Sequence, residues 1–259
     1  MNKKDYDERI LEHLSDTNTY QQINCDYSEA FRKKINDYLK LLKLNKVITD
    51  PQYDYLFSCA AKLPSFYALI KIHKPGYPIR PIVSFCGSPS YFCARFLSKI
   101  LTPATSNCQF KLKNSLSAKE KLKTYIINDA YTLISFDIIS LFTSIPHDLA
   151  ISSTKKFLEN NPDIFRSTTL NSDHILKLIS LCLDASFFSS RGMFFKQIKG
   201  LPMGSPISVV LAEIVVQEIE QNILQSINCQ FWFHFVDDII ACIPNDKVLD
   251  TLDTLNSVN

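Results

Sequence analysis

Two adjacent carboxylates, Asp237 and Asp238, interrupt an almost wholly apolar run that extends from Phe231 to Ile243. A run of this kind predicts two short strands joined by a hairpin turn at or near the acidic pair. Carboxylates so close to a buried strand carry a desolvation cost unless a positive group lies on them. Two adjacent anions increase that cost, and a divalent metal ion would relieve it. The alternative is an ordinary solvated acidic turn.

A third carboxylate, Asp137, ends a predicted strand at residues 131–137. The apolar residues on both sides make this an unusual place for a charge, although a helix N-cap or a simple strand terminator is the alternative. If this strand neighbours the 231–243 hairpin in one sheet, the three acids converge. Converging carboxylates can hold two divalent ions roughly 3.5–4 Å apart, which stabilise both oxygens of an in-line phosphoryl displacement. Aspartate oxygens are suitable ligands for Mg²⁺.

A loop rich in glycine and proline precedes a predicted helix at residues 207–223. Gly200 and Gly204 lie in this loop, which ends at Pro206. Glycine permits a close backbone approach that a side chain would forbid, and free N–H groups at a helix N-terminus favour anions and polar ligand edges. The loop is therefore a candidate binding segment, with an ordinary connecting loop as the alternative.

Three cations lie around a proline-rich predicted hairpin at residues 65–84: Lys71, Lys74 and Arg80. Together they could grip a triphosphate, with the arginine making a bidentate contact. The alternative is an ordinary basic surface turn, here expected at residues 73–78.

The spacing of apolar residues predicts the elements that position these groups. Residues 1–60 are expected to be helical, and a hairpin is expected to turn at Arg191-Gly192. Further strands are predicted at residues 65–72, 79–84 and 131–137, and further helices at residues 91–97, 146–158, 173–184 and 207–223. This irregular mixture favours an α+β fold over regular βαβ winding.

Composition places the chain among ordinary globular proteins. Its 259 residues are 46% hydrophobic and 21% charged, which is enough apolar material for a sizeable core. The net charge of +2 is too small to indicate nucleic-acid binding by itself. Lysines are nevertheless concentrated in one stretch that contains Glu120 as its single acid: Lys99, Lys111, Lys113, Lys119, Lys121 and Lys123. This stretch is either a surface for a phosphate backbone or a solvated helix face.

Cysteine usage and the N-terminus bear on the compartment. The eight cysteines lack CxxC spacing, so zinc ribbons and secreted disulfide frameworks are poorly supported. Cys182 and Cys242 lie inside apolar runs and are predicted to be small core residues in a reducing compartment. The charged N-terminus has no signal-peptide core, and no apolar stretch reaches the ~18 residues that span a bilayer. We expect an intracellular, soluble protein without membrane contact, located in the nucleus.

Taken in order, these segments resemble the fingers and palm of a reverse transcriptase. Residues 136–142 resemble the first catalytic motif of that family, an Asp followed five residues later by an aromatic. Residues 201–206 resemble its second motif, and residues 235–238 resemble its aromatic-x-Asp-Asp motif, with Phe where Tyr is commoner. Within the family, the motif sequences are similar to those of the Penelope-like retroelement branch over roughly residues 47–245.

The resemblance implies a fold of right-hand fingers and palm, with an antiparallel palm sheet and packed helices. It divides the chain into an N-terminal helical region at residues 1–62 and a reverse transcriptase domain at residues 63–259. We expect the thumb and an endonuclease domain to be missing, because little sequence follows Asp238. The role of residues 1–46 stays open.

The resemblance also implies an RNA-directed DNA polymerase that uses two Mg²⁺ ions, with Mn²⁺ as a substitute. Asp137, Asp237 and Asp238 are the implied metal-binding and catalytic acids, with Asp237 the surer ligand of the adjacent pair. The Ile138 carbonyl is implied to complete a metal shell. The implied partners are an RNA template, a DNA primer and deoxynucleoside triphosphates (dNTPs).

The same resemblance assigns nucleotide-binding roles. Phe142 is implied to lie under the incoming sugar and to clash with a 2′-hydroxyl. Met203 and Gly204 are implied to shape the pocket beside the nascent base pair, and Arg80, with Lys71 or Lys74, to hold the triphosphate. Two alternatives remain: an RNA-dependent RNA polymerase palm, and an inactive retroelement relic that binds only nucleic acid.

Overall fold

The computed structural model of the chain describes residues 2–72 and 74–257. It combines helices with two β-sheets, so the predicted α+β class is confirmed. The turn predicted at residues 73–78 includes His73, which lies outside the described residues. None of the helices in the described ranges combines the length and the apolar character that crossing a bilayer requires.

The helices include those that the sequence predicts after residue 90, found here as α4, α7, α8 and α9. The α-helices are α1 (Lys3–Leu14), α2 (Ser28–Leu44), α3 (Asp50–Leu56), α4 (Tyr91–Thr105), α5 (Ser115–Leu122), α6 (Leu141–Ser144), α7 (His147–Asn160), α8 (Ser172–Asp184), α9 (Ser208–Ile223) and α10 (Val248–Asn256), and short 3₁₀ turns cover Pro162–Arg166 and Asn245–Lys247. The strands are β1 (Tyr20–Ile23), β2 (Ser65–Ile70), β3 (Ile79–Ser84), β4 (Tyr131–Asp137), β5 (Phe187–Ser190), β6 (Met193–Gln197), β7 (Phe231–Phe235) and β8 (Asp238–Pro244).

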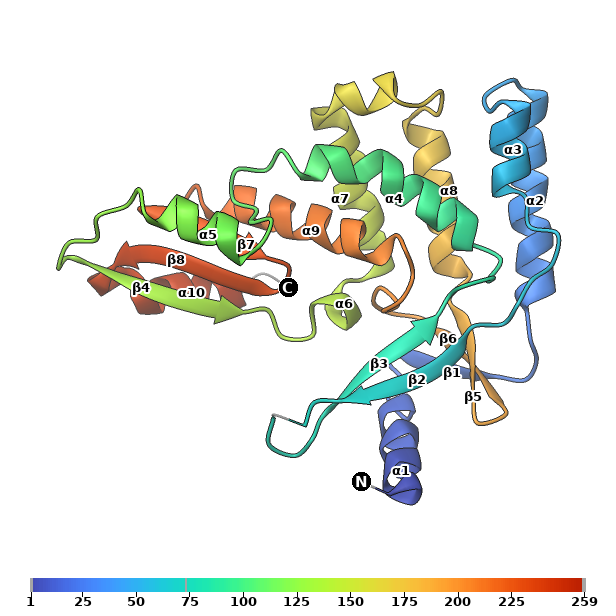
Figure 1. Cartoon of the computed structure of the whole chain (residues 1–259), viewed down its shortest axis with the longest axis horizontal. Helices are drawn as coiled ribbons and strands as arrows, with labels where there is room; N and C mark the ends of the chain where they lie inside the picture. The colour runs from blue at the N-terminus through green and yellow to red at the C-terminus, as the bar shows by residue number, and fades with distance from the viewer. Residues whose placement is uncertain (1, 73, 258–259) are drawn as a thin grey trace.

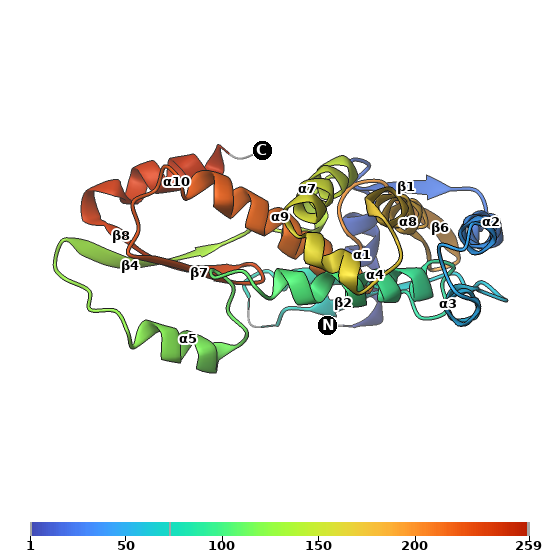
Figure 2. The same cartoon turned by 90° about the horizontal axis from the view of Figure 1, so that it is seen from above.

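The three-stranded sheet is antiparallel in the order β4-β8-β7. The strand of Asp137 therefore neighbours the acidic hairpin, as the sequence predicts. Side chains alternate between the two faces, so Trp232 and Ile239 pack with α9 and α10 on one face. Phe231 and Phe233 pack on the other face with the segment that contains α5. Figure 2 shows α5 and α10 on opposite sides of this sheet.

The five-stranded sheet has the order β1-β6-β5-β2-β3. Its β5–β6 hairpin turns at Arg191 and Gly192, whose φ angles of +53° and +79° suit a type I′ turn. The predicted hairpin is therefore confirmed. Residues 1–60 are largely helical as expected, but they also contain β1, which pairs with β6 along its whole length.

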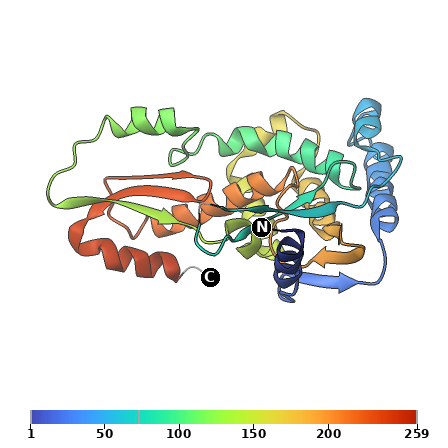
Figure 3. The same ribbon diagram turned by 60° about the horizontal axis from the view of Figure 1, so that its bottom comes forward.

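A helical core joins the two sheets. Residues of α4, α7, α8 and α9 form its centre together with α2 and α3. Helix α9 is buried on nearly every side, as an all-round apolar helix should be. Figures 1 and 3 show α2 and α3 at the opposite end of the molecule from the three-stranded sheet. All eight cysteines, each in a described range, are free thiols, and Cys182 and Cys242 are buried as predicted.

The lysine-rich stretch does not behave as one surface. Lys121 lies over the Phe233 ring at 4.6 Å from its centroid and donates to the Gln109 carbonyl oxygen at 2.7 Å. Lys111 pairs with Glu213 at 3.2 Å. Two of the lysines therefore fasten this segment to the sheet and to α9. Three others lie exposed to solvent: Lys113, Lys119 and Lys123.

Candidate active site

Asp137 and Asp238 lie directly opposite each other, at the end of β4 and the start of β8. The Ile138 amide donates to the Asp237 carbonyl oxygen at 2.9 Å, so Ile138 and Asp237 form the next hydrogen-bonded pair. Asp137 and Asp238 are therefore a pair without mutual backbone hydrogen bonds. In such pairs the side chains come closest, with Cβ atoms about 4.5–5.5 Å apart. The register thus places two carboxylates side by side on one face of the sheet.

The turn between β7 and β8 consists of Val236 and Asp237, because Phe235 pairs with Asp238. Val236 has a φ of +59°, and Asp237 is not among the residues with positive φ. Positive φ at the first turn residue alone is the pattern of a type II′ turn. A β-branched residue in this region is strained, and such strain persists where neighbouring structure fixes it, often at functional sites. The predicted hairpin is confirmed.

All three acids are exposed to solvent. The sequence predicted a desolvation cost from the apolar neighbours of these acids. That cost is small, because the acids lie at strand ends outside the core, so burial does not distinguish them from ordinary surface aspartates. Their placement does so instead. Like charges directly opposite each other on neighbouring strands are destabilising, and a bound cation would remove that repulsion.

The donor set fits Mg²⁺ in kind, since aspartate carboxylates and the backbone carbonyl of Ile138 are hard oxygen ligands. Among the described residues, no group of three or more His, Cys, Asp or Glu side chains is arranged so that it could hold a metal ion. Asp137 and Asp238 are brought together, while Asp237 occupies the adjoining turn. The register sets Asp238 opposite Asp137 and Asp237 opposite the next residue, Ile138.

The loop of residues 200–206 is fastened to both neighbouring parts of the molecule. The Leu201 amide donates to the Phe142 carbonyl oxygen in α6 at 2.6 Å, and the Val83 amide in β3 donates to the Met203 carbonyl oxygen at 2.8 Å. His147 Nε2 lies 2.9 Å from the Gly200 carbonyl oxygen. The loop thus joins the aromatic residue that follows Asp137 to an edge strand of the five-stranded sheet.

Two glycines make this docking possible. A Cβ on Gly204 would lie 2.1 Å from the Val83 carbonyl oxygen, and a Cβ on Gly200 would lie 2.6 Å from the backbone of Thr143. Both glycines also have positive φ. The loop therefore requires glycine at both positions, for space and for conformation. The sequence indicated the close approach but gave no sign that its partner is protein backbone.

Lys71, Lys74 and Arg80 lie on the β2–β3 hairpin, in the sheet that does not contain the acids. Lys74 and Arg80 are exposed and Lys71 is half-buried. Within residues 2–72 and 74–257, no ion pair involves these three side chains. They are thus available to an anionic ligand, although no contact links them to Asp137 or Asp238.

A buried polar network lies behind the acids and was not foreseen. His234 in β7 is fully buried, with Nδ1 2.9 Å from Glu220 Oε1 and Nε2 3.0 Å from Glu213 Oε1. Burial alone would lower the pKa of His234, but the hydrogen bonds to both glutamates raise it to about 9. The signal in the sequence was a pair of glutamates seven residues apart on an apolar helix, which places both on one face.

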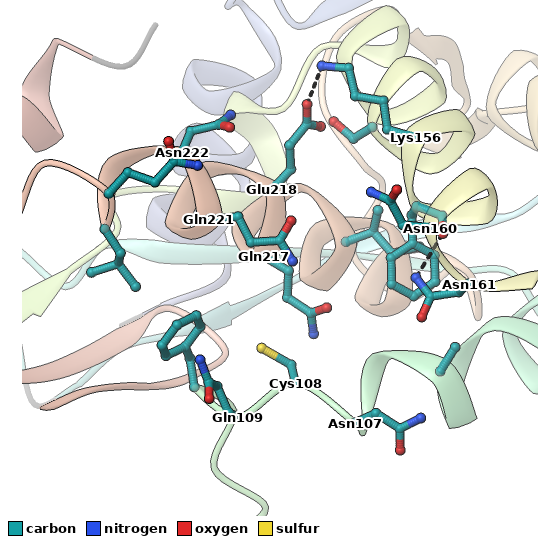
Figure 4. A pocket seen from close by; sticks show the side chains of 17 residues that line it. Asn107, Cys108, Gln109, Lys156, Asn160, Asn161, Gln217, Glu218, Gln221 and Asn222 are labelled. Carbon is teal, nitrogen blue, oxygen red and sulfur yellow. Dashed lines mark hydrogen bonds and ion pairs between the residues drawn. The ribbon is translucent and has the colours of Figure 1, made fainter.

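A cavity of about 700 Å³ lies between the end of α4, α7 and α9 (Figure 4). Its lining is rich in carboxamides, among them Asn160 and Gln221. None of the site residues predicted from the sequence lines it. The three acids are instead exposed to solvent, away from this cavity.

A family model described as reverse transcriptase (RNA-dependent DNA polymerase) matches residues 72–258. A search of curated proteins finds no match.

Solved polymerase structures share the fold. Apo telomerase from Candida tropicalis is 10% identical with a TM-score of 0.61, over 97% of this chain and 44% of the telomerase. Telomerase from Candida albicans in complex with a TWJ fragment of telomeric RNA is 11% identical with a TM-score of 0.55, over 89% and 44%. The BmCPV RNA-dependent RNA polymerase at quiescent state is 11% identical with a TM-score of 0.50, over 88% and 23%.

These likenesses confirm the predicted polymerase fingers-and-palm fold. The chain spans less than half the length of the telomerases that it matches. At such low identity the solved structures show the fold alone.

Proposed function

The chain belongs to the reverse transcriptase (RNA-dependent DNA polymerase) family, and from this premise we propose that it is an RNA-directed DNA polymerase of a retroelement. The observation that carries the proposal is the register of the three-stranded sheet, which sets Asp137 opposite Asp238 beside a strained turn. A Penelope-like origin is part of the proposal and is supported by the amino-acid sequences of the motifs alone.

In the proposed reaction, the primer 3′-hydroxyl attacks the α-phosphate of a dNTP and pyrophosphate leaves. Asp137, Asp237 and Asp238, with the Ile138 carbonyl, would hold two Mg²⁺ ions, which when bound neutralise charge on the attacking and leaving oxygens. The chain itself supplies the scaffold. The β4–β8 ladder fixes two of the acids relative to each other, and the Ile138–Asp237 hydrogen bond ties the turn to β4.

The nucleotide pocket is proposed to form where the 200–206 loop meets α6 and β3. Phe142 would contact the sugar, and Met203 and Gly204 would face the nascent base pair. The hydrogen bonds of this loop to Phe142 and Val83 support the proposal, because they hold these residues in one place. Arg80, with Lys71 or Lys74, would bind the triphosphate from the β2–β3 hairpin.

The proposed partners are an RNA template, a DNA primer and dNTPs. Template choice would rest on base pairing, so that contacts of the protein go mainly to backbone and shape. The exposed lysines around α5 suit a phosphate backbone. An intracellular, nuclear location is also part of the proposal.

The test is primer extension on an RNA template with Mg²⁺. Asp237→Asn, Asp137→Asn and Asp238→Asn should each abolish extension, because each removes one carboxylate of the proposed donor set, while thermal unfolding stays near that of the wild type. Asp54→Asn is the matched control, since Asp54 is an exposed aspartate on α3. Extension that persists in Asp237→Asn would refute the metal-binding role.

A second candidate is an RNA-dependent RNA polymerase, favoured by the likeness to the BmCPV enzyme. The aromatic side chain of Phe142 argues against it, because it is expected to exclude a 2′-hydroxyl. The third candidate is a relic that binds RNA weakly, with strong salt dependence and no turnover. Supplying dNTPs and rNTPs separately on the same primer–template distinguishes all three.

A further inference from the structure

The buried network behind the acids connects His234, Trp232 and two glutamates of α9. His234 is 0% exposed, Glu220 1% and Glu213 7%. His234 contacts both glutamates through its two ring nitrogens, and the Trp232 indole donates to Glu220 Oε1 at 2.8 Å. Glu213 further accepts from Gln217 at 2.7 Å and pairs with Lys111 at 3.2 Å. Within the part of the chain that the structure describes, Glu220 Oε2 has no hydrogen-bond partner, and the other contacts hold the imidazole between the two glutamates.

The backbone of His234 is held as firmly as its side chain. Its amide donates to the Phe110 carbonyl oxygen at 2.8 Å, and its carbonyl oxygen accepts from the Leu112 amide at 2.8 Å. These bonds cover the outer edge of β7. His234 is therefore fixed on both sides, by α9 and by the segment that precedes α5.

The network joins the two halves of the proposed catalytic centre. His234 lies opposite Ile239, next to the Phe235–Asp238 pair that closes the strained turn. Glu213 and Glu220 lie on α9, whose first residue Ser208 donates through Oγ to the Pro202 carbonyl oxygen of the nucleotide loop at 2.8 Å. One side of the network thus carries the acids, and the other carries the loop.

We infer that His234 is a positioning residue, which clamps β7 to Glu213 and Glu220 of α9 and thereby fixes the acidic turn relative to the loop of residues 200–206. The effect of His234 on catalysis rests on the proposed function. The claim that His234 holds the acidic turn in place does not.

Charge balance supports this role. The charged groups that face the imidazole are Glu213 and Glu220 from α9, and Lys111 reaches Glu213 from the segment before α5. Cys108 is the other titratable group nearby, and burial raises the pKa of its thiol, with a further rise from the two glutamates. Two carboxylates therefore face Lys111 and a protonated His234, and removal of the imidazole would leave a buried anion without its partner.

The experiment is hydrogen exchange on the full chain, followed at the Ile138 amide, which reports on the turn through its bond to Asp237. His234→Gln should raise exchange there by about tenfold relative to amides of the β2–β3 hairpin, because local opening is no longer opposed by the clamp. His174→Gln is the control: this half-buried residue occupies the third position of a capping box, where glutamine is also suitable. Glu220→Gln is a milder second variant that keeps the volume, and it should give a smaller rise.

Mn²⁺ binding and primer extension are measured on the same samples. If the inference holds, His234→Gln binds Mn²⁺ more weakly and extends primers more slowly than the His174→Gln control. Unchanged exchange at Ile138 in both network variants would overturn the positioning role, even in an active polymerase. If the wild type neither binds Mn²⁺ nor extends primers, the proposed function fails, while the exchange data still decide whether His234 holds the turn.

Discussion

Asp137 and Asp238 are two carboxylates that the backbone places next to each other. Both side chains are exposed to solvent, and the β4–β8 ladder holds them opposite each other. Opposed like charges cost stability in the absence of a counter-ion. The arrangement is therefore better suited to holding a cation than to stabilising the sheet, which is the physical reason for the catalytic role that we propose for these residues.

Phe142 is expected to decide which sugar is accepted. Phe142→Ala should lower the preference for dNTPs over rNTPs, because the ring that would exclude a 2′-hydroxyl is gone. Contacts of this size in a pocket are worth about 10–200-fold in discrimination. The measurement is kcat/KM for each nucleotide in primer extension. Phe96→Ala, a half-buried phenylalanine of the same core, is the control. An unchanged ratio in Phe142→Ala would count against the assignment.

Gly204 should be intolerant of any side chain. Gly204→Ala places a methyl group 2.1 Å from the Val83 carbonyl oxygen. The overlap should cost about 1–3 kcal/mol, in addition to the backbone strain of positive φ. Gly192→Ala is the matched control, because Gly192 also has positive φ but has open space around it. Urea unfolding of the two variants measures the difference, and equal losses would show that the loop moves away freely.

At the scale of elements, hairpins were predictable where local residues determine them. The Arg191-Gly192 turn follows from two short apolar strands around a residue pair that tolerates positive φ. By contrast, β1 contains two glutamines and little apolar pattern, and it becomes a strand because the edge of β6 offers it a ladder. Such long-range pairing leaves no local signal.

The register of β4 against β8 was likewise beyond the sequence. Apolar patterning predicted that the two strands are neighbours, which the structure confirms. A shift of one residue in the pairing of β8 with β4 would place Asp237 instead of Asp238 opposite Asp137. Such a shift would also move every side chain of the strand to the other face of the sheet. For this reason the sequence did not indicate that Asp238 is the residue opposite Asp137.

Helix α1 forms hydrogen bonds to the β2–β3 hairpin. Part of residues 1–46 therefore supports this hairpin. The Tyr6 hydroxyl donates to the Ala68 carbonyl oxygen at 3.0 Å and accepts from the Ala68 amide at 2.9 Å. Ala68 is opposite Pro81 in a ladder position whose polar groups point away from β3. Arg9 also donates to the Gly76 carbonyl oxygen at 2.8 Å, in the turn of the hairpin.

Tyr6→Phe should therefore destabilise the fold by about 1–3 kcal/mol, because it leaves both partly buried backbone groups of Ala68 without a partner. The measurement is the free energy of unfolding from urea titration. Tyr67→Phe makes the same chemical change on an exposed residue of β2 and should have little effect. If the two variants are equally stable, water replaces the hydroxyl and α1 contributes less to the hairpin than its contacts indicate.

At the scale of the whole molecule, the two sheets do not pair with each other, and their alignment depends on what lies between them. The loop of residues 200–206 contacts β3 on one side and α6 on the other. Helix α9 continues from that loop to Glu213 and Glu220, which hold β7 through His234. The position of the loop of residues 200–206 relative to the acids is thus set by one continuous path of backbone and buried polar contacts.

The ionisation of His234 makes this path sensitive to pH. Its pKa is raised from 6.5 to about 9 in the folded protein, so the folded state binds the proton more tightly than the unfolded state. The stabilisation is fully present below pH 6.5 and is lost as the pH rises through about 9. A shift of this size corresponds to at most about 3 kcal/mol.

Wild type and His234→Gln should accordingly differ most in free energy of unfolding at pH 6, and the difference should narrow as the pH approaches 9. Comparing the two proteins isolates the imidazole, because buried thiols such as Cys93, whose pKa burial raises to about 12, also destabilise the fold in alkali. Their effect begins only above pH ~8.5, where thiols of the unfolded chain ionise, and it is common to both proteins. Urea titrations at intervals between pH 6 and 9 measure the difference. A gap that stays constant over this range would mean that His234 binds its proton equally tightly in the folded and unfolded states, so that its two glutamates do not stabilise its charge.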